Sequence, residues 1–160
     1  MFYGWALVMR SFISTDNSAS KSDSWLTPLN IIEALGSDFD LDPCGFEFHK
    51  TAKIIYELPV CGLASAWHGK VFLNPPYSKL KIWLDKLSEH GYGTALVFNR
   101  ADTSVMQHHF TKASSVFFLS GRLSFLKKDL TRMSNAGTGS ILLSYGYTPD
   151  YSKLKGWKAK

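Results

Sequence analysis

Residues 71–77 read Val-Phe-Leu-Asn-Pro-Pro-Tyr, and this stretch predicts both a strand and a site at its end. The apolar run Val71 to Leu73 suits a short buried strand. The two prolines that follow Asn74 cannot continue the strand, because proline has no backbone N–H and a fixed φ angle. The chain therefore leaves the sheet stiffly, which holds the Asn74 amide oxygen and the Pro75 carbonyl in fixed directions.

Two fixed acceptors suit a planar amino group, because such a group has two N–H bonds to donate. Pairing with both acceptors favours a pyramidal nitrogen, whose lone pair can then face an electrophile. Tyr77 adds an aromatic face against which a base can stack. The alternative interpretation is a strand-ending turn with a tyrosine in the core. The amide just before the turn and the helix expected after it favour the functional interpretation.

The rest of the chain alternates between candidate strands and helices, which indicates an open α/β sheet. We expect one helix to begin at Thr27 as N-cap with Pro28 in its first turn. A second follows Tyr77, and a third spans residues 103–112. The further strand candidates are residues 39–41, 54–56, 94–98, 115–119, 123–126 and 140–145.

Three polar segments follow candidate strands: residues 42–45, 74–77 and 99–103. In open α/β sheets the ligand lies beyond the carboxyl ends of the strands. We therefore expect these three segments to meet at one edge of the sheet.

Composition indicates which binding partner and which cellular compartment to expect. The 160 residues suit one domain, and 18 Lys and Arg against 13 Asp and Glu give a net charge of +5, which fits a nucleic-acid partner. The two cysteines form no CxxC pair, so a reduced, cytoplasmic compartment is the simpler expectation. The apolar residues 1–13 are too short to span a bilayer, so no membrane association is expected. We divide the chain into an N-terminal extension and linker (1–22), a main domain (23–148) and a basic C-terminal tail (149–160).

The motif Asn74-Pro75-Pro76-Tyr77 resembles the (D/N/S)PPY motif of amino-group methyltransferases. Over roughly residues 23–146 the chain is similar to the phage-type DNA adenine-N6 methyltransferases in the order and spacing of four segments. These segments are Trp25-x-Thr27-Pro28, Phe39-Asp40-Leu41-Asp42, Val71 to Ser78, and Gly121-Arg122-Leu123-x-Phe125.

The resemblance implies a Rossmann-like methyltransferase fold, with a mostly parallel open sheet and helices on both faces. It also implies S-adenosylmethionine as methyl donor, adenine N6 in DNA as acceptor, and a phage or prophage protein acting in the bacterial host cytoplasm, as in restriction and modification. Asn74, Pro75, Pro76 and Tyr77 would then be catalytic. The cofactor would contact Trp25, Thr27, Pro28, Asp42 and Gly45.

The match departs from the family pattern at two places. No G-x-G run follows the first strand, where the chain has only Asp42-Pro43-Cys44-Gly45; a cofactor without phosphates needs no phosphate cradle. Cys61 stands where members often carry an acidic residue, so the contact to the adenosine is unassigned.

Lys79, Arg100 and Arg122 are candidates for contacts to DNA phosphates. A solvated helix face at Lys79 and a braced turn at Arg122 are the alternatives. No metal is expected, because the adjacent His108 and His109 diverge on a helix and cannot chelate one ion together.

Three hypotheses of function stay open: adenine N6 methylation, methylation of another amine (cytosine N4, an RNA base or a protein glutamine), and a DNA-binding protein that has lost catalysis. The sequence does not determine the oligomeric state.

Overall fold

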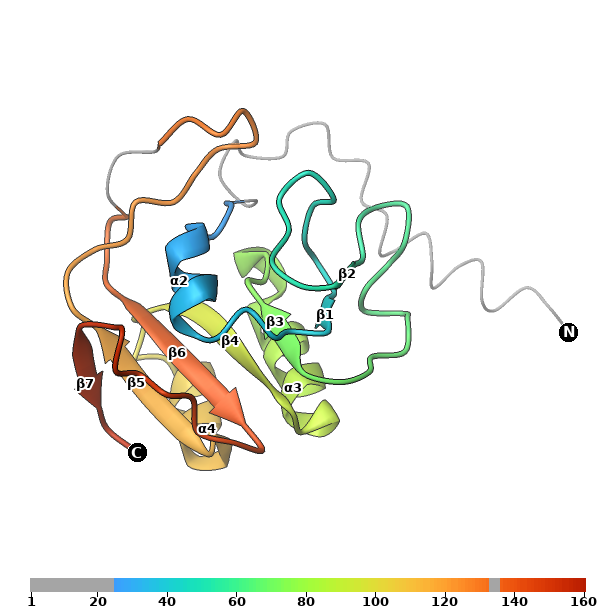
Figure 1. Ribbon diagram of the computed structural model, residues 1–160. Coiled ribbons are helices and arrows are strands. Elements are labelled where there is room, and N and C mark those ends of the chain that lie inside the picture. Colours follow the sequence, from blue (N-terminus) through green and yellow to red (C-terminus); the bar gives the residue numbers. More distant parts are fainter. Residues whose placement is uncertain (1–24, 133–135) are drawn as a thin grey trace, which may run out of the picture.

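The computed structural model describes residues 25–132 and 136–160, and these residues form an α/β fold around a seven-stranded open sheet (Figure 1). The N-terminal extension expected at residues 1–22 lies outside the described residues. The strand order is β2-β1-β3-β4-β6-β5-β7. The strands are β1 (Leu41–Asp42), β2 (Ile54–Ile55), β3 (Val71–Leu73), β4 (Gly93–Phe98), β5 (Ser115–Leu119), β6 (Ser140–Tyr145) and β7 (Gly156–Lys158).

The sheet is parallel in one half and antiparallel in the other. Strands β2, β1, β3 and β4 pair in parallel, whereas β6 runs antiparallel to both β4 and β5, and β7 runs antiparallel to β5. The antiparallel ladders hold most of the paired residues, so the expectation of a mostly parallel sheet is wrong. The reason is the connection from β5 to β6. It contains no crossover helix among the described residues, and a chain that returns without a crossover forms an antiparallel pair.

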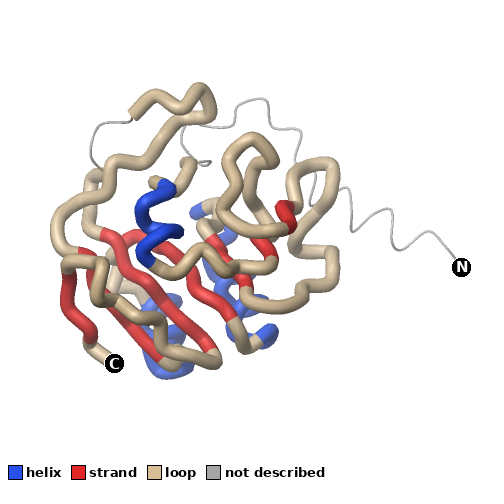
Figure 2. The backbone as a smooth tube through the Cα atoms, in the orientation of Figure 1, coloured by secondary structure: helices blue, strands red, loops and turns tan. Residues whose placement is uncertain are grey.

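Helices cover both faces of the sheet, as expected (Figure 2). They are α2 (Leu29–Ala34), α3 (Leu80–His90) and α4 (Ser104–Lys112), with a short 3-10 helix, η1 (Tyr77–Lys79), before α3. Side chains alternate along β3, because successive residues of a strand point to opposite faces. Val71 and Leu73 pack with α3 and α4, while Phe72 packs with α2.

Two local expectations about strands and helix starts are wrong. Thr27 does not cap α2: Pro28 occupies the N-cap position without a side-chain hydrogen bond, and Thr27 is buried. Residues 123–126 form no strand, and Leu126 makes only isolated bridges to Leu26 and Arg132. In contrast, Thr103 caps α4 by accepting a hydrogen bond from the Met106 N–H at 3.4 Å.

The C-terminal residues, expected to be a basic tail, are part of the body. Strand β7 pairs with β5 at the edge of the sheet. The Tyr151 ring stacks on Phe117, with 4.2 Å between centroids. Among the described residues, no helix is long and apolar enough to cross a membrane.

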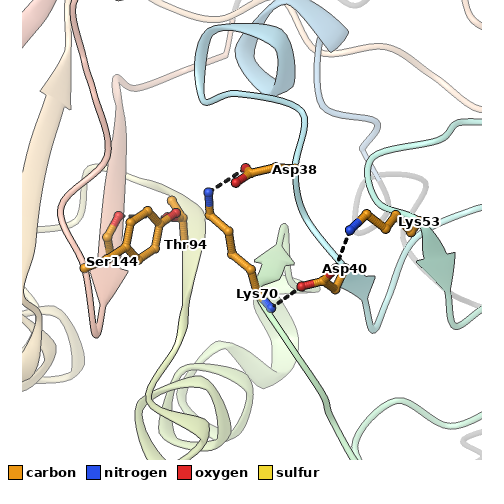
Figure 3. Close-up of polar contacts among 7 residues, drawn as sticks. Asp38, Asp40, Lys53, Lys70, Thr94 and Ser144 are labelled. Carbon is orange, nitrogen blue, oxygen red and sulfur yellow. Dashed lines mark hydrogen bonds and ion pairs between the residues drawn. The ribbon is translucent and has the colours of Figure 1, made fainter.

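A charged network fixes the beginnings of β1 and β3 (Figure 3). Lys70 is only 7% exposed, and its ammonium donates to Asp38 at 2.5 Å. Its backbone N–H donates to Asp40 at 2.8 Å, and Lys53 donates to the same carboxylate at 2.7 Å. The network lies at the end of β3 opposite to Asn74, so it holds the strands in place without occupying the candidate site.

Close contact between β3 and β4 gives a stability prediction. A Cβ added at Gly93 would lie 2.4 Å from the Val71 carbonyl oxygen, whereas one added at Gly137 would meet no atom within 4 Å. We expect Gly93→Ala to lower the free energy of unfolding by about 1–3 kcal/mol, because the backbone of β3 must move. Gly137→Ala is the matched control and should change it little. Urea denaturation measures both, and equal stability of the two variants would contradict this close packing.

Candidate functional site

Two of the three polar segments meet at the carboxyl ends of β1 and β3. The Cys44 thiol donates to the Asn74 carbonyl at 3.3 Å, which joins residues 42–45 to residues 74–77. The third segment, residues 99–103, follows β4, which runs parallel to β3, so it leaves the sheet at the same edge. Phe98, the last residue of β4, stacks on Tyr77.

The two segments share one pocket with the residues that precede α2. Five of the expected site residues line it: Trp25, Thr27, Asp42, Gly45 and Asn74. The other lining residues are Leu26, Cys44, Phe46, His49 and Thr51. Pro28 lies next in the chain to the lining residue Thr27 but does not itself line the pocket.

Asp42 is a buried carboxylate at the wall of this pocket. One of its oxygens accepts from the Cys44 N–H at 3.1 Å, and the other accepts from the Thr51 hydroxyl. Burial raises the pKa of Asp42 from its usual 3.8 to about 6, against the opposing effect of these hydrogen bonds. A Cβ at Gly45 would lie 2.6 Å from the carboxylate, so the chain can pass here only without a side chain.

The Asn74 side chain is fixed by two hydrogen bonds to the segment before α2. Its amide nitrogen donates to the Trp25 carbonyl at 2.7 Å and to the Thr27 hydroxyl at 3.1 Å. A carbonyl oxygen only accepts, so the amide nitrogen must face Trp25. The Asn74 amide oxygen is thereby directed away from this segment, as an acceptor for another group.

His49 extends this arrangement by one further hydrogen bond. It is buried, and its Nε2 donates to the Thr27 carbonyl at 2.7 Å. His49, Thr27 and Asn74 therefore form a continuous series across three separate segments of the chain. Shifting any one of them would change where the Asn74 amide oxygen points.

Tyr77 lies in an aromatic cluster beside the pocket. Its ring stacks on Phe98 at 4.5 Å between centroids, and its hydroxyl accepts from the Phe98 N–H. Burial raises the pKa of the Tyr77 phenol well above its ordinary value, so the phenol is neutral at physiological pH. Trp25 contacts Phe98 edge to face at 5.2 Å and Phe125 at 5.5 Å, so the cluster joins the segment before α2 to β4 and to residues 121–126.

The three candidates for phosphate contacts lie outside the pocket lining. Lys79 is partly buried in η1. Arg100 is exposed, with its Nε 3.6 Å from the Asp102 carboxylate, and Arg122 is exposed. Within residues 25–132 and 136–160, no group of three or more His, Cys, Asp and Glu side chains is placed to hold a metal ion.

The sequence did not point to Phe46, His49 and Thr51. All three lie in the loop between β1 and β2, where no periodicity identifies buried residues. The proximity of His49 and Thr51 to Asp42 in the chain was the available signal, but only the folded loop shows that these side chains turn inward.

The family follows from a comparison with known proteins. A family model described as DNA N-6-adenine-methyltransferase (Dam) matches residues 14–151. The chain belongs to this family. The match includes every residue that lines the pocket, and it confirms the family resemblance of the sequence. At the level of the family, it indicates an enzyme that methylates adenine in DNA. No curated protein and no solved structure matched the chain.

The buried carboxyl of Asp42 gives a prediction about pH. Its raised pKa means that the unfolded chain releases this proton before the folded chain does, so stability falls as the pH rises from about 4 to above 6. The difference between 3.8 and about 6 corresponds to about 3 kcal/mol. Asp42→Asn has no proton to release and should escape this loss.

Urea denaturation of both proteins between pH 4 and pH 7 measures the effect. The wild-type free energy of unfolding should fall relative to that of Asp42→Asn across this range. Parallel pH profiles would show that Asp42 titrates normally in the folded protein. Asp150→Asn, at an exposed carboxylate, is the control.

Proposed function

We propose that the chain transfers a methyl group from S-adenosylmethionine to N6 of adenine in DNA. The observation that carries this proposal is the orientation of Asn74. Both of its amide N–H groups are directed at Trp25 and Thr27, so its oxygen serves as an acceptor for the amine. Together with the Pro75 carbonyl, this oxygen would receive the two N–H bonds of N6.

The pocket lining fits S-adenosylmethionine in its chemistry. The buried indole N–H of Trp25 has no hydrogen-bond partner among the described residues, so an acceptor on a ligand would satisfy it. The Asp42 carboxylate can accept from amino or hydroxyl groups, and the absence of a side chain at Gly45 leaves its backbone accessible beside Asp42. When bound, the cofactor supplies an electrophilic methyl group on a positively charged sulfur.

The residues of the site would act by holding the amine in place. The adenine must leave the duplex to reach the pocket, at a cost of about a few kcal/mol. Stacking against the ring of Tyr77, which Phe98 supports from one side, would offset part of this cost. The fixed acceptors of Asn74 and Pro75 would then orient the N6 lone pair towards the methyl group; the new N–C bond would replace the S–C bond, and N6 would lose one proton. No covalent bond to the protein is needed, and positioning supplies most of the catalysis.

The Asn74 contacts lead to a prediction about turnover. Asn74→Ala should reduce methyl transfer about a hundredfold or more, because a preorganised polar contact in a transition state contributes about 3–4 kcal/mol. Asn74→Asp should also lose most of its activity, since a carboxylate cannot donate to the Trp25 carbonyl. Asn30→Ala, at an exposed position of α2, is the control and should remain active.

The assay is incorporation of labelled methyl groups into DNA, followed by nucleoside analysis. Full activity of Asn74→Ala would refute the mechanism. N4-methylcytosine as product would preserve the mechanism but change the substrate. Label found only with RNA or protein as acceptor would refute the assignment of DNA.

Cofactor binding can be tested separately from catalysis. We expect calorimetry to detect binding of S-adenosylmethionine or its demethylated product, and Asp42→Ala to weaken it roughly tenfold to a hundredfold, the range for a hydrogen bond to a charged group. Asp150→Ala, which alters an exposed carboxylate away from the pocket, should bind as the wild type does. The absence of heat and of a thermal shift with either compound would refute the cofactor assignment.

A further inference from the structure

Residues 121–132, here called the basic arm, connect β5 towards β6 and carry an unusual concentration of charge. The arm has four cationic side chains and one carboxylate, Asp129, so it contributes +3 to the chain's formal net charge of +5. All four cations are exposed. They are Arg122, Lys127, Lys128 and Arg132.

The arm is held against the pocket at three points. Leu126 and Leu26 exchange backbone hydrogen bonds of 2.9 and 3.1 Å. Phe125 is buried against Trp25 and Phe98. These contacts attach the arm to the same segment that fixes Asn74, so the arm has a defined position relative to the proposed site.

The third point lies on the loop between β1 and β2. The Lys128 ammonium lies 4.7 Å from the centre of the Phe46 ring, and Phe46 lines the pocket. Figure 1 shows the arm (orange) at the same end of the molecule as this loop. The arm thus contacts two of the segments that surround the pocket, and Lys128 lies beside a residue that lines it.

The charges of the arm are available to a partner. None of the ion pairs formed within residues 25–132 and 136–160 involves its four cations. Asp129 accepts from the backbone N–H and the hydroxyl of Thr131, at 2.9 and 2.6 Å, so it is engaged within its own turn. A base that entered the pocket would leave its flanking phosphates outside it.

We propose that the basic arm is the element that docks the protein on duplex DNA, with Lys127 and Lys128 contacting phosphates that flank the target base. The inference rests on the proposed function, because it takes the pocket as the place where the base is received. Contacts to phosphates contribute to affinity and register rather than to sequence choice.

The test compares two variants that lose the same charge. Lys127→Ala/Lys128→Ala removes two cations from the arm. Lys112→Ala/Lys158→Ala removes two exposed cations from the end of α4 and from β7. Affinity for a fluorescent DNA duplex is measured by anisotropy at several salt concentrations, after circular dichroism has shown that both variants are folded.

For the arm variant we expect the slope of log affinity against log salt to decrease in magnitude by about two, and the Kd at low salt to rise at least about tenfold. The control variant should keep the wild-type slope. An unchanged slope in the arm variant, equal losses in both variants, or weakened binding of RNA alone would overturn the proposal.

The outcome is separable from that of the proposed function. If the wild type forms N6-methyladenine and the arm variant binds duplex DNA as tightly as the wild type, the docking role is refuted and the activity stands. If DNA binding depends on the arm but no methylated nucleoside forms, the docking role stands and the proposed activity is refuted.

Discussion

The candidate site depends on the two hydrogen bonds that the Asn74 amide donates to Trp25 and Thr27. These bonds connect the end of β3 to a segment 49 and 47 positions earlier in the chain. They hold this segment at the pocket, which it lines, and they direct the Asn74 oxygen away from the segment. The Asn74 side chain thus both holds this segment and presents the proposed acceptor. The shape of the pocket and the position of the acceptor therefore cannot vary independently.

The same dependence extends outward from the pocket. His49 holds Thr27 from the loop after β1, and Leu126 holds Leu26 from the basic arm. The short segment before α2 therefore receives contacts from three sides, although it forms no regular strand. In the proposed function, this segment transmits the position of the DNA-docking arm to the residues that would hold the base and the cofactor.

Two aspartates, Asp40 just before β1 and Asp42 at its end, show how position controls chemistry. Asp40 is near the surface, where the Lys53 and Lys70 hydrogen bonds lower its pKa. Asp42, two residues later, is buried at the pocket wall, and desolvation raises its pKa to about 6. The first fixes the beginning of the strands, and the second is available to a ligand. Identical residue types in one short stretch thus differ because the strand carries one of them into the interior.

The sequence by itself determined several of the regular elements and the motif. The strand candidates at residues 71–73, 115–119 and 140–145 match the bounds of β3, β5 and β6, and the helix expected after Tyr77 is α3, because these signals are local and periodic. The stiff Asn-Pro-Pro-Tyr turn was likewise predictable from the sequence, since proline restricts the backbone φ angle whatever the rest of the fold. Tertiary structure decided the features that depend on distant partners. It placed β6 antiparallel between β4 and β5, and it turned the side chains of His49 and Thr51 inward. It also made the Thr27 hydroxyl an acceptor for Asn74 instead of a helix cap. These contacts join residues far apart in the chain, and hydrogen bonds of that kind follow no spacing rule that a sequence can reveal.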